Sequence, residues 1–184
     1  QYDISNGNYN SRSPYNYGMF AISTILIKTS FSTSDENSSA AFDDFRSNRL
    51  PIANRLATEK GIDLSNPANI DAEGYPKGFG KNNQAVLLPA FLAAYSGESA
   101  SSTSLGIFKS FPVPNWSIKY NGLMRFDFFK KNFKRFSLQQ NYIASYSISA
   151  FRSNFEYDKN PNGVDISGNY YNKTIMSNVN LVER

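Results

Sequence analysis

Two runs of alternating apolar and polar residues lie on either side of a short turn rich in lysine and phenylalanine. The first run begins at Trp116 and the second ends at Ala150. Side chains alternate across a β-strand with period two, so each run has one apolar and one polar surface. The sequence therefore predicts an antiparallel hairpin with two chemically different faces.

The two faces of this hairpin point to two different surroundings. We assign the apolar face to lipid, and its members are Trp116, Ile118, Tyr120, Leu138, Tyr142, Tyr146 and Ile148. We assign the polar face to an aqueous lumen, and its members are Ser117, Lys119, Asn121, Ser145 and Ser147. A soluble sheet usually carries a dense mixture of Lys and Glu on its outer face, whereas Ser, Asn and Gln suit a wet barrel lumen.

The length of the alternation favours a membrane setting. It continues from Trp116 to Phe128 and from Phe136 to Ala150, whereas strands of soluble proteins average about 5 to 6 residues. At roughly 3.3 Å per residue such a run spans about 40 Å, enough to cross a tilted outer-membrane wall. We therefore expect a mainly β fold, an antiparallel transmembrane β-barrel segment with a partly helical insertion. The alternative is a large soluble β-sandwich with long strands.

The chain divides into three segments by pattern. Residues 1–33 are expected to form an N-terminal loop and a barrel strand, with the strand in the β-branched run from Met19 to Phe31. Residues 34–110 are expected to form a partly helical insertion at the barrel mouth or in its lumen. Residues 111–184 are expected to form antiparallel barrel strands with a short basic-aromatic turn, one long polar loop and a last strand over Ile175–Leu181.

Two helices are expected within the insertion. Apolar residues at helical spacing predict the first from Ser38 to Lys60, with Gly61 as its C-terminal cap, and Pro51 makes it either two short helices or one kinked helix. The second is the run QAVLLPAFLAAY, which Asn82 or Asn83 would cap and which would end near Gly97.

The residue inventory excludes several kinds of chemistry. The chain contains no histidine, which excludes His-based acid–base catalysis, Ser-His-Asp triads and most zinc sites. It contains no cysteine, so it has neither disulfides nor thiolate ligands. Adjacent acids such as Asp43 and Asp44 point in different directions on a helix and do not converge on a substrate. We expect no enzyme, no catalytic residue, no cofactor and no resident metal.

The polar loop from Asp158 to Asn169 resembles half of a calcium-binding loop. Asp158, Asn160, Asn162 and Gly163 match its first half, but position twelve is Asn169 in place of the chelating Glu. Asn, Asp and Gly are ordinary turn formers. A structural turn is therefore the favoured interpretation, and a weak ion site is the alternative.

The turn FFKKNFKRF interleaves four cations with phenylalanines. Such a pattern can bind single-stranded nucleic acid by stacking and charge. Aromatic girdles with neighbouring cations are also typical of the interface between a membrane and water, and this interpretation is favoured here. The formal charge of +4 is too small and too dispersed to indicate a nucleic-acid partner.

A membrane crossing by this chain would have to use strands. It has no run of about 20 apolar residues as a membrane helix requires, and a strand-based crossing needs a closed barrel. We count about four long strands, whereas the smallest outer-membrane barrels have about 8. The chain also starts at Gln1 without a signal peptide and stops at Arg184 within an alternating run. We expect it to be a piece of a larger protein.

Several long phrases resemble one protein family. The segments PVPNWSIKYNGL and FFKKNFKRFSL, together with GFGKNNQAVLLPAFLAAY and FAISTILIKTSFSTSD, resemble SprA/Sov, the giant outer-membrane translocon of the bacterial type IX secretion system. The resemblance covers most of the chain from about Phe20 onward. It implies a very large single-chain barrel in the bacterial outer membrane whose lumen passes folded cargo.

The resemblance also implies a set of partners. They are the remainder of the same barrel chain, a PorV-like outer-membrane barrel partner, a periplasmic plug protein, secreted cargo proteins and membrane lipid, with no nucleic acid. The function expected is passive conduction and gating without bond chemistry. The alternative is an outer-membrane receptor or adhesin β-barrel whose loops bind a surface ligand.

Overall fold

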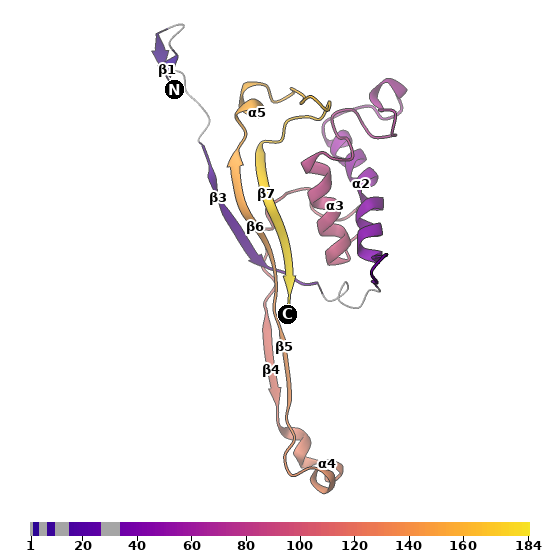
Figure 1. Ribbon diagram of the computed structural model, residues 1–184, viewed down its shortest axis with the longest axis vertical. Coiled ribbons are helices and arrows are strands. Elements are labelled where there is room, and N and C mark those ends of the chain that lie inside the picture. Colours follow the sequence, from indigo (N-terminus) through magenta and orange to yellow (C-terminus); the bar gives the residue numbers. More distant parts are fainter. Residues whose placement is uncertain (1, 4–6, 10–14, 27–33) are drawn as a thin grey trace.

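A computed structural model of the chain describes residues 2–3, 7–9, 15–26 and 34–184. It has a sheet with helices on one side and a long arm that extends beyond them (Figure 1). The strands are β1 (Tyr2–Asp3), β2 (Asn8–Tyr9), β3 (Tyr17–Ser23), β4 (Trp116–Tyr120), β5 (Leu138–Tyr142), β6 (Ala144–Ser153) and β7 (Thr174–Glu183). The α-helices are α2 (Ala40–Glu59), α3 (Gln84–Ser96), α4 (Asp127–Asn132) and α5 (Phe155–Lys159), and short 3-10 turns span Pro67–Asn69 and Gly122–Arg125.

The main sheet has three antiparallel strands in the order β3-β6-β7, with β6 in the centre. Ile148 of β6 pairs with Phe20 on one side and with Val179 on the other. The register of β3 shifts between Gly18 and Phe20, which is the mark of a β-bulge. Because paired residues share a face, these three apolar side chains lie on the same side of the sheet.

Helices α2 and α3 form a layer beside this sheet, and local sequence signals set their ends. The side chain of Ser39 accepts a hydrogen bond from the backbone N–H of Phe42, and that of Asn83 accepts one from Ala85. Gly97 ends α3 in the left-handed region, with φ of 65°. These are ordinary caps at the first and last turns of a helix.

Helix α3 lies between α2 and the sheet, so the core has two parts. On one side of α3, small side chains allow the two helices to approach closely, and the buried members are Ile52, Ala53, Ala57, Val86 and Ala90. On its other side Leu92 packs against Tyr146 and Ile148 of β6. From the sheet outward, α3 therefore comes first and α2 second.

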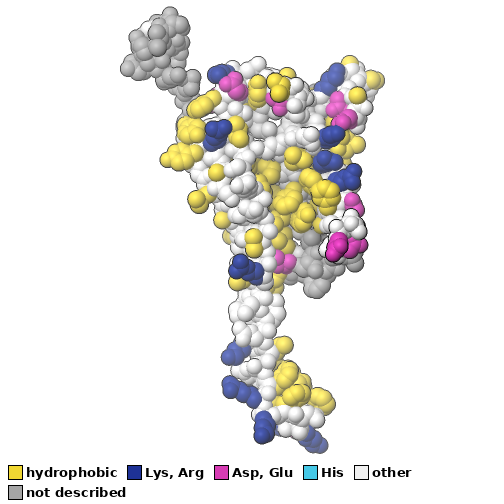
Figure 2. Space-filling view, viewed as in Figure 1, with side chains coloured by type: hydrophobic (Ala, Val, Ile, Leu, Met, Phe, Trp, Pro, Cys, Tyr) yellow, Lys and Arg dark blue, Asp and Glu magenta, His cyan; other side chains and the backbone are white. Residues whose placement is uncertain are grey.

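Strands β4 and β5 pair as a hairpin that forms the arm (Figure 1). Helix α4 lies at the end of the arm. Figure 2 shows Lys and Arg side chains along the left edge and at the bottom of this end, with hydrophobic side chains gathered on its right. Strands β5 and β6 are separated by Ile143 alone, so the arm continues directly into the centre of the main sheet.

The polar loop after α5 returns to the helical layer. Asn169 forms an isolated parallel bridge with Gly78, and its side-chain oxygen accepts a hydrogen bond from the Gly80 N–H at 2.9 Å. The ring of Tyr170 packs edge-on against Phe79 with centroids 5.3 Å apart. The loop is thus attached to the segment that precedes α3.

The expectation of a mainly β segment of a transmembrane barrel is wrong. Helices and strands occupy similar shares of the described residues, and the strands form small sheets beside a helical layer. Helices α2 and α3 contribute more to the fold than this expectation allowed, because the contact between them forms one of the two parts of the core. Within the described ranges, no helix is both long enough and apolar enough to cross a membrane.

The first strand of the hairpin is shorter than the alternation predicts. Strand β4 ends at Tyr120, and the backbone of Asn121 turns to φ −109° and ψ 0°. A side chain at Gly122 would collide with the Tyr120 ring, so glycine permits the 3-10 turn that follows. The alternation from Met124 to Phe128 therefore lies in turns and helix α4, and its period of two does not indicate a strand.

The helix predictions meet mixed outcomes. The second helix is confirmed, with Asn83 as its cap and Gly97 at its end. The first helix is also present as one element, α2, which runs through Pro51 from Ala40 to Glu59, so the alternative of two short helices is wrong. The last strand is confirmed in β7. Strand β3 covers part of the run predicted over Met19–Phe31, and residues 27–31 of that run lie outside the described residues.

Candidate functional site

The candidate site is the two-faced ribbon formed by β4, β5 and β6. In the arm, Trp116 pairs with Tyr142 and Tyr120 pairs with Leu138, so these four side chains share the apolar face. The polar face carries the alternate pairs, such as Ser117 with Asn141. The sequence therefore sorted these residues correctly between the two faces of the arm.

The part of the apolar face that belongs to the arm is uncovered. Ile118 is 57% exposed, Tyr120 is 48% exposed and Leu138 is 54% exposed, while Trp116 is half-buried. Exposed apolar side chains gathered on one face mark a contact surface when they are contiguous. The assignment of these four residues to lipid stays a prediction.

The part of the apolar face that belongs to the main sheet is covered by protein. Tyr146 and Ile148 have no exposed surface, and Tyr142 is only 6% exposed. Leu92 of α3 packs on the first two, and Leu26 packs with Tyr142. The expectation that Tyr142, Tyr146 and Ile148 lie at an outer surface is corrected by this packing. Alternation identified the face but could not identify what covers it.

The junction between the arm and the sheet is fixed by hydrogen bonds. The phenolic oxygen of Tyr142 accepts one from the N–H of Leu26 at 2.7 Å, and the side-chain oxygen of Asn115 accepts one from Ala144 at 3.0 Å. Ile143 and Arg184 exchange a pair of backbone hydrogen bonds of 2.9 and 2.7 Å. These hydrogen bonds connect the junction between β5 and β6 to the segment after β3, to the segment before β4 and to the end of β7.

Tyr146 is the largest of the fully buried side chains. Its hydroxyl donates a 3.0 Å hydrogen bond to the carbonyl of Ile107. Burial raises the pKa of Tyr146 from 10.0 to about 12, because the phenolate loses hydration in this position. The ring links the centre of the sheet to the segment that follows the helices.

The polar face differs between the arm and the sheet. In the arm, Ser117 and Lys119 are exposed, and the Ser117 hydroxyl donates to the side-chain oxygen of Asn141 at 2.6 Å. In the sheet, Ser145 and Ser147 are half-buried. Asn121 lies just beyond the end of β4, so it is exposed but no longer part of the strand's polar face. The contact of these five residues with a lumen stays a prediction.

A groove on the side of the main sheet away from α3 was not foreseen. It has a volume of about 850 Å³ and is lined mainly by apolar groups, which include Tyr15, Tyr17, Met19, Ala150 and Ile175. Tyr17 is 77% exposed and Met19 is 81% exposed. Alternate residues of the run from Tyr17 to Ala21 are apolar, which could have indicated an apolar surface on this side of the sheet. The other side of the same run also carries apolar side chains, so the sequence did not show which side is uncovered.

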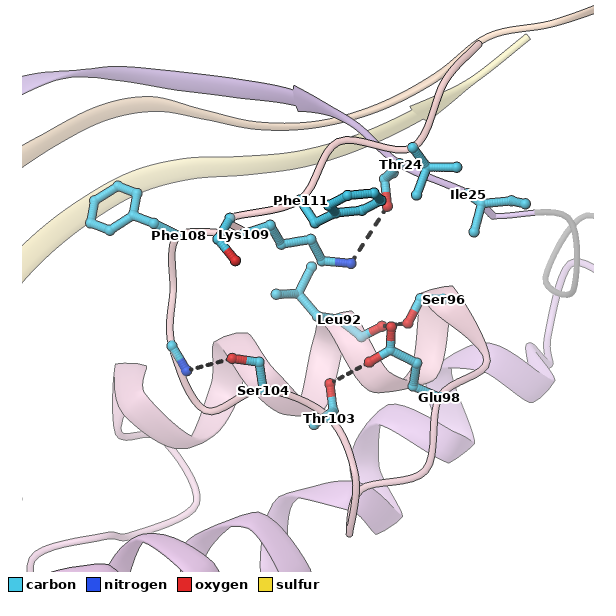
Figure 3. Close-up of a pocket in the computed structure, with 13 residues that line it drawn as sticks. Thr24, Ile25, Leu92, Ser96, Glu98, Thr103, Ser104, Phe108, Lys109 and Phe111 are labelled. Carbon is cyan, nitrogen blue, oxygen red and sulfur yellow. Dashed lines mark hydrogen bonds between the residues drawn. The ribbon is translucent and has the colours of Figure 1, made fainter. Parts of the chain in front are cut away.

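A smaller cavity lies between α3 and the edge of the sheet (Figure 3). Its volume is about 260 Å³, and its polar groups contact one another. The hydroxyl of Thr103 donates to Glu98 at 2.9 Å, and the ammonium of Lys109 donates to the Thr24 hydroxyl at 3.5 Å. Leu92 lies between these two pairs in the view of Figure 3. These polar groups at the rim of the cavity therefore already have hydrogen-bond partners within the rim.

The residues of the calcium-like loop serve as turn acceptors. The Asp165 carboxylate accepts from the N–H groups of Ser167 and Asn169 at 2.8 and 2.9 Å. The side-chain oxygen of Asn162 accepts from the ammonium of Lys60 at 3.0 Å, which places a positive charge at one of the predicted ligands. Across the described residues no group of three potential metal-binding side chains occurs.

Comparison with known proteins identified no relative of this chain. The chain matches no family model and no curated protein sequence.

Proposed function

We propose that this chain is a segment of an outer-membrane protein-translocation channel of the type IX secretion kind. In this role its polar strand face borders the aqueous path of folded cargo proteins. The observation that carries the proposal is the continuous two-faced ribbon, with α3 packed on its apolar side and small hydroxyl side chains on its other side. The resemblance of the long sequence segments to SprA/Sov supports the same function.

A surface that guides a moving protein must not hold it. Ser145 and Ser147, which do not line the apolar groove, present short, uncharged hydroxyl groups at alternate positions of β6. Such side chains keep water at the surface and offer neither deep apolar contact nor a strong charge. Conduction along this face is therefore passive, and the chain carries out no bond chemistry.

The helical layer supports the ribbon from its apolar side. The guanidinium of Arg55 on α2 donates to the carbonyls of Ala100 and Thr103 at 2.7 and 2.9 Å, so it fastens the segment after α3. That segment in turn carries Ile107, the acceptor of the Tyr146 hydroxyl. A rigid support of this kind keeps the polar face in one shape while cargo passes.

The proposal includes the partners that the resemblance implies. These are the remainder of the same chain, a PorV-like partner protein, a periplasmic plug protein, cargo and membrane lipid, all at the bacterial outer membrane. The charged groups of the polar face are few, with Lys119 on the arm and Arg152 near the end of β6.

A second candidate is an outer-membrane receptor or adhesin that binds a surface ligand. The groove of about 850 Å³ beside Tyr17 and Met19 favours it, because an open apolar groove is a common form of ligand site. The two candidates place their occupants differently, since cargo would contact Ser145 and Ser147 of the polar face, which do not line the groove, and a ligand would contact β3 and Ser149.

The first test is the mass of the native polypeptide that contains this sequence, extracted from outer membranes in mild detergent and identified by peptide mapping. A polypeptide many times larger than the 20.7 kDa of this chain supports the translocon. A native species near 20.7 kDa contradicts it.

The second test uses the absence of cysteine from the 184 residues. Ser147→Cys places a thiol on the polar face outside the groove, and Ser47→Cys places a comparison thiol on the exposed side of α2. The proposal expects stalled cargo to protect Ser147→Cys from a water-soluble maleimide and to leave Ser47→Cys reactive. Equal labelling of Ser147→Cys with and without cargo contradicts it. Protection of Met19→Cys by a surface ligand supports the receptor instead.

A further inference from the structure

The end of the arm, residues 125–136, projects away from both layers of the fold (Figure 1). We call these residues the arm tip. It is connected to the rest of the described structure through β4 and β5, which pair with each other and not with the main sheet. The composition of the tip therefore does not follow from the packing of the core.

Phenylalanines of the arm tip fall into two groups. Phe129, Phe133 and Phe136 contact one another, with ring centroids 5.0 to 5.9 Å apart. Phe126 lies outside this cluster and is 60% exposed, and Phe128 contacts only its edge at Phe129, with centroids 5.4 Å apart, and is 67% exposed. The cluster gives the tip a small apolar core, and the two exposed rings remain as contact groups.

The arm tip is strongly cationic. Arg125, Lys130, Lys131, Lys134 and Arg135 are all exposed, and Asp127 is the one acid among residues 125–136. The Lys130 ammonium lies 3.7 Å from the Asp127 carboxylate, a weak exposed pair. Figure 2 shows cations along the left edge and at the bottom of the protruding end, beside hydrophobic side chains on its right.

We propose that the arm tip docks on an anionic lipid surface. Phe126 and Phe128 insert among the headgroups, and the neighbouring Lys and Arg side chains contact lipid phosphates. Aromatic side chains favour the interface between membrane and water, and nearby cations are attracted by anionic headgroups. The placement of this surface in the outer membrane rests on the proposed function, whereas its lipid chemistry rests on the residues of the tip.

Single-stranded nucleic acid is a poorer match for this geometry. Proteins that bind it combine a cationic groove that follows the backbone with aromatic faces on which successive bases stack. Here four of the five rings are engaged with one another, and the cations lie on a protrusion. A convex, cationic end with exposed rings instead complements an extended anionic surface.

The test is flotation of the 184-residue chain with two kinds of vesicle, phosphatidylcholine alone and phosphatidylcholine mixed with phosphatidylglycerol. We expect binding to the anionic vesicles, with Lys131→Glu/Lys134→Glu reducing the partition coefficient at least about tenfold. The double variant Arg46→Glu/Lys77→Glu makes the same change of net charge at exposed sites far along the chain, and it should bind like the unchanged protein. Phe128→Ser should weaken binding, because it removes an inserted ring.

Three results would overturn the proposal. They are equal binding to both vesicles, equal losses in the two double variants, and binding of a single-stranded oligonucleotide that vesicles do not displace. The lipid proposal and the proposed function fail separately. A very large native polypeptide whose tip does not bind anionic vesicles rejects the lipid contact alone. A small native species with normal vesicle binding rejects the translocon alone.

Discussion

The indole ring of Trp116 stacks on the ring of Tyr142, with centroids 4.3 Å apart and planes inclined by 19°. This pair lies where the apolar face of the ribbon passes from protein contact to an open surface. On the arm side Ile118 is 57% exposed, and on the sheet side Tyr146 is fully buried. The pair is therefore the physical joint between a packed domain and a projecting arm.

The joint predicts a local effect of Trp116→Ala. The substitution removes the stacked pair, which contributes about 0.5 to 1.5 kcal/mol beyond its buried area, and it removes the indole donor to Gln140. We expect faster amide hydrogen exchange in β4 and β5 with little change in β6 and β7. Tyr120→Ala, near the far end of β4, is the control and should affect the arm less. An equal increase across all four strands would contradict a joint at Trp116.

The covered half of the ribbon predicts an asymmetry between adjacent residues. Ile148 has no exposed surface and contacts Leu92, so Ile148→Ala leaves a cavity and should cost about 2 to 5 kcal/mol of unfolding free energy. Ser147 points to the opposite face, and Ser147→Ala should change the free energy by about 0.5 kcal/mol or less. Urea unfolding of both variants measures the difference. Similar values for the two would contradict the packing of α3 on β6.

The ends of the helices were predictable because short-range signals decide them. Asn83 and Gly97 carry the chemistry of their caps within one turn, so the bounds of α3 follow from the sequence. The period-two sorting of Trp116 and Ser117 was predictable for the same reason. Pro51 left open whether this region forms one helix or two, and a helix with enough tertiary contact can tolerate a proline that would break it alone.

What covers each face was not predictable from a local pattern. Leu92 and Tyr146 are far apart in the chain, and nothing near either residue specifies their contact. An apolar face looks the same in a sequence whether lipid or a helix lies against it, so Tyr146 and Ile148 were assigned to the wrong surroundings. The end of β4 was missed because Asn121 and Gly122 turn the chain while the alternation continues past them.

Two glycines with positive φ predict different costs for the same substitution. Gly78 has φ of +88° and a Cβ there would collide with the ring of Tyr170, whereas Gly61 has φ of +78° and open space around it. Gly61→Ala should therefore cost only the backbone strain, about 1 to 2 kcal/mol. Gly78→Ala should cost more, because it must also displace the ring that connects the polar loop to the helical layer. Thermal or urea unfolding compares the two, and equal costs would show that Tyr170 moves away freely.

Tyr146 predicts a loss of stability at high pH. Its pKa is about 12 in the fold and 10.0 as the reference value, so between these values the unfolded chain loses the proton first. The folded state then holds more protons than the unfolded state, and the unfolding free energy falls as pH rises, by roughly 2 kcal/mol over this window. Below pH 10.0 this contribution is fully present.

Tyr146→Phe isolates this effect from all other groups that titrate at high pH. At neutral pH the variant should be less stable by about 1 kcal/mol, because the Ile107 carbonyl loses its hydrogen bond. As the pH rises from 10.0 toward 12 the advantage of Tyr146 should shrink and then reverse, since only the tyrosine can ionise in the unfolded chain. Urea unfolding of both proteins at a series of pH values measures the gap. A gap that stays constant over this range would mean that the hydroxyl ionises as readily in the fold as outside it.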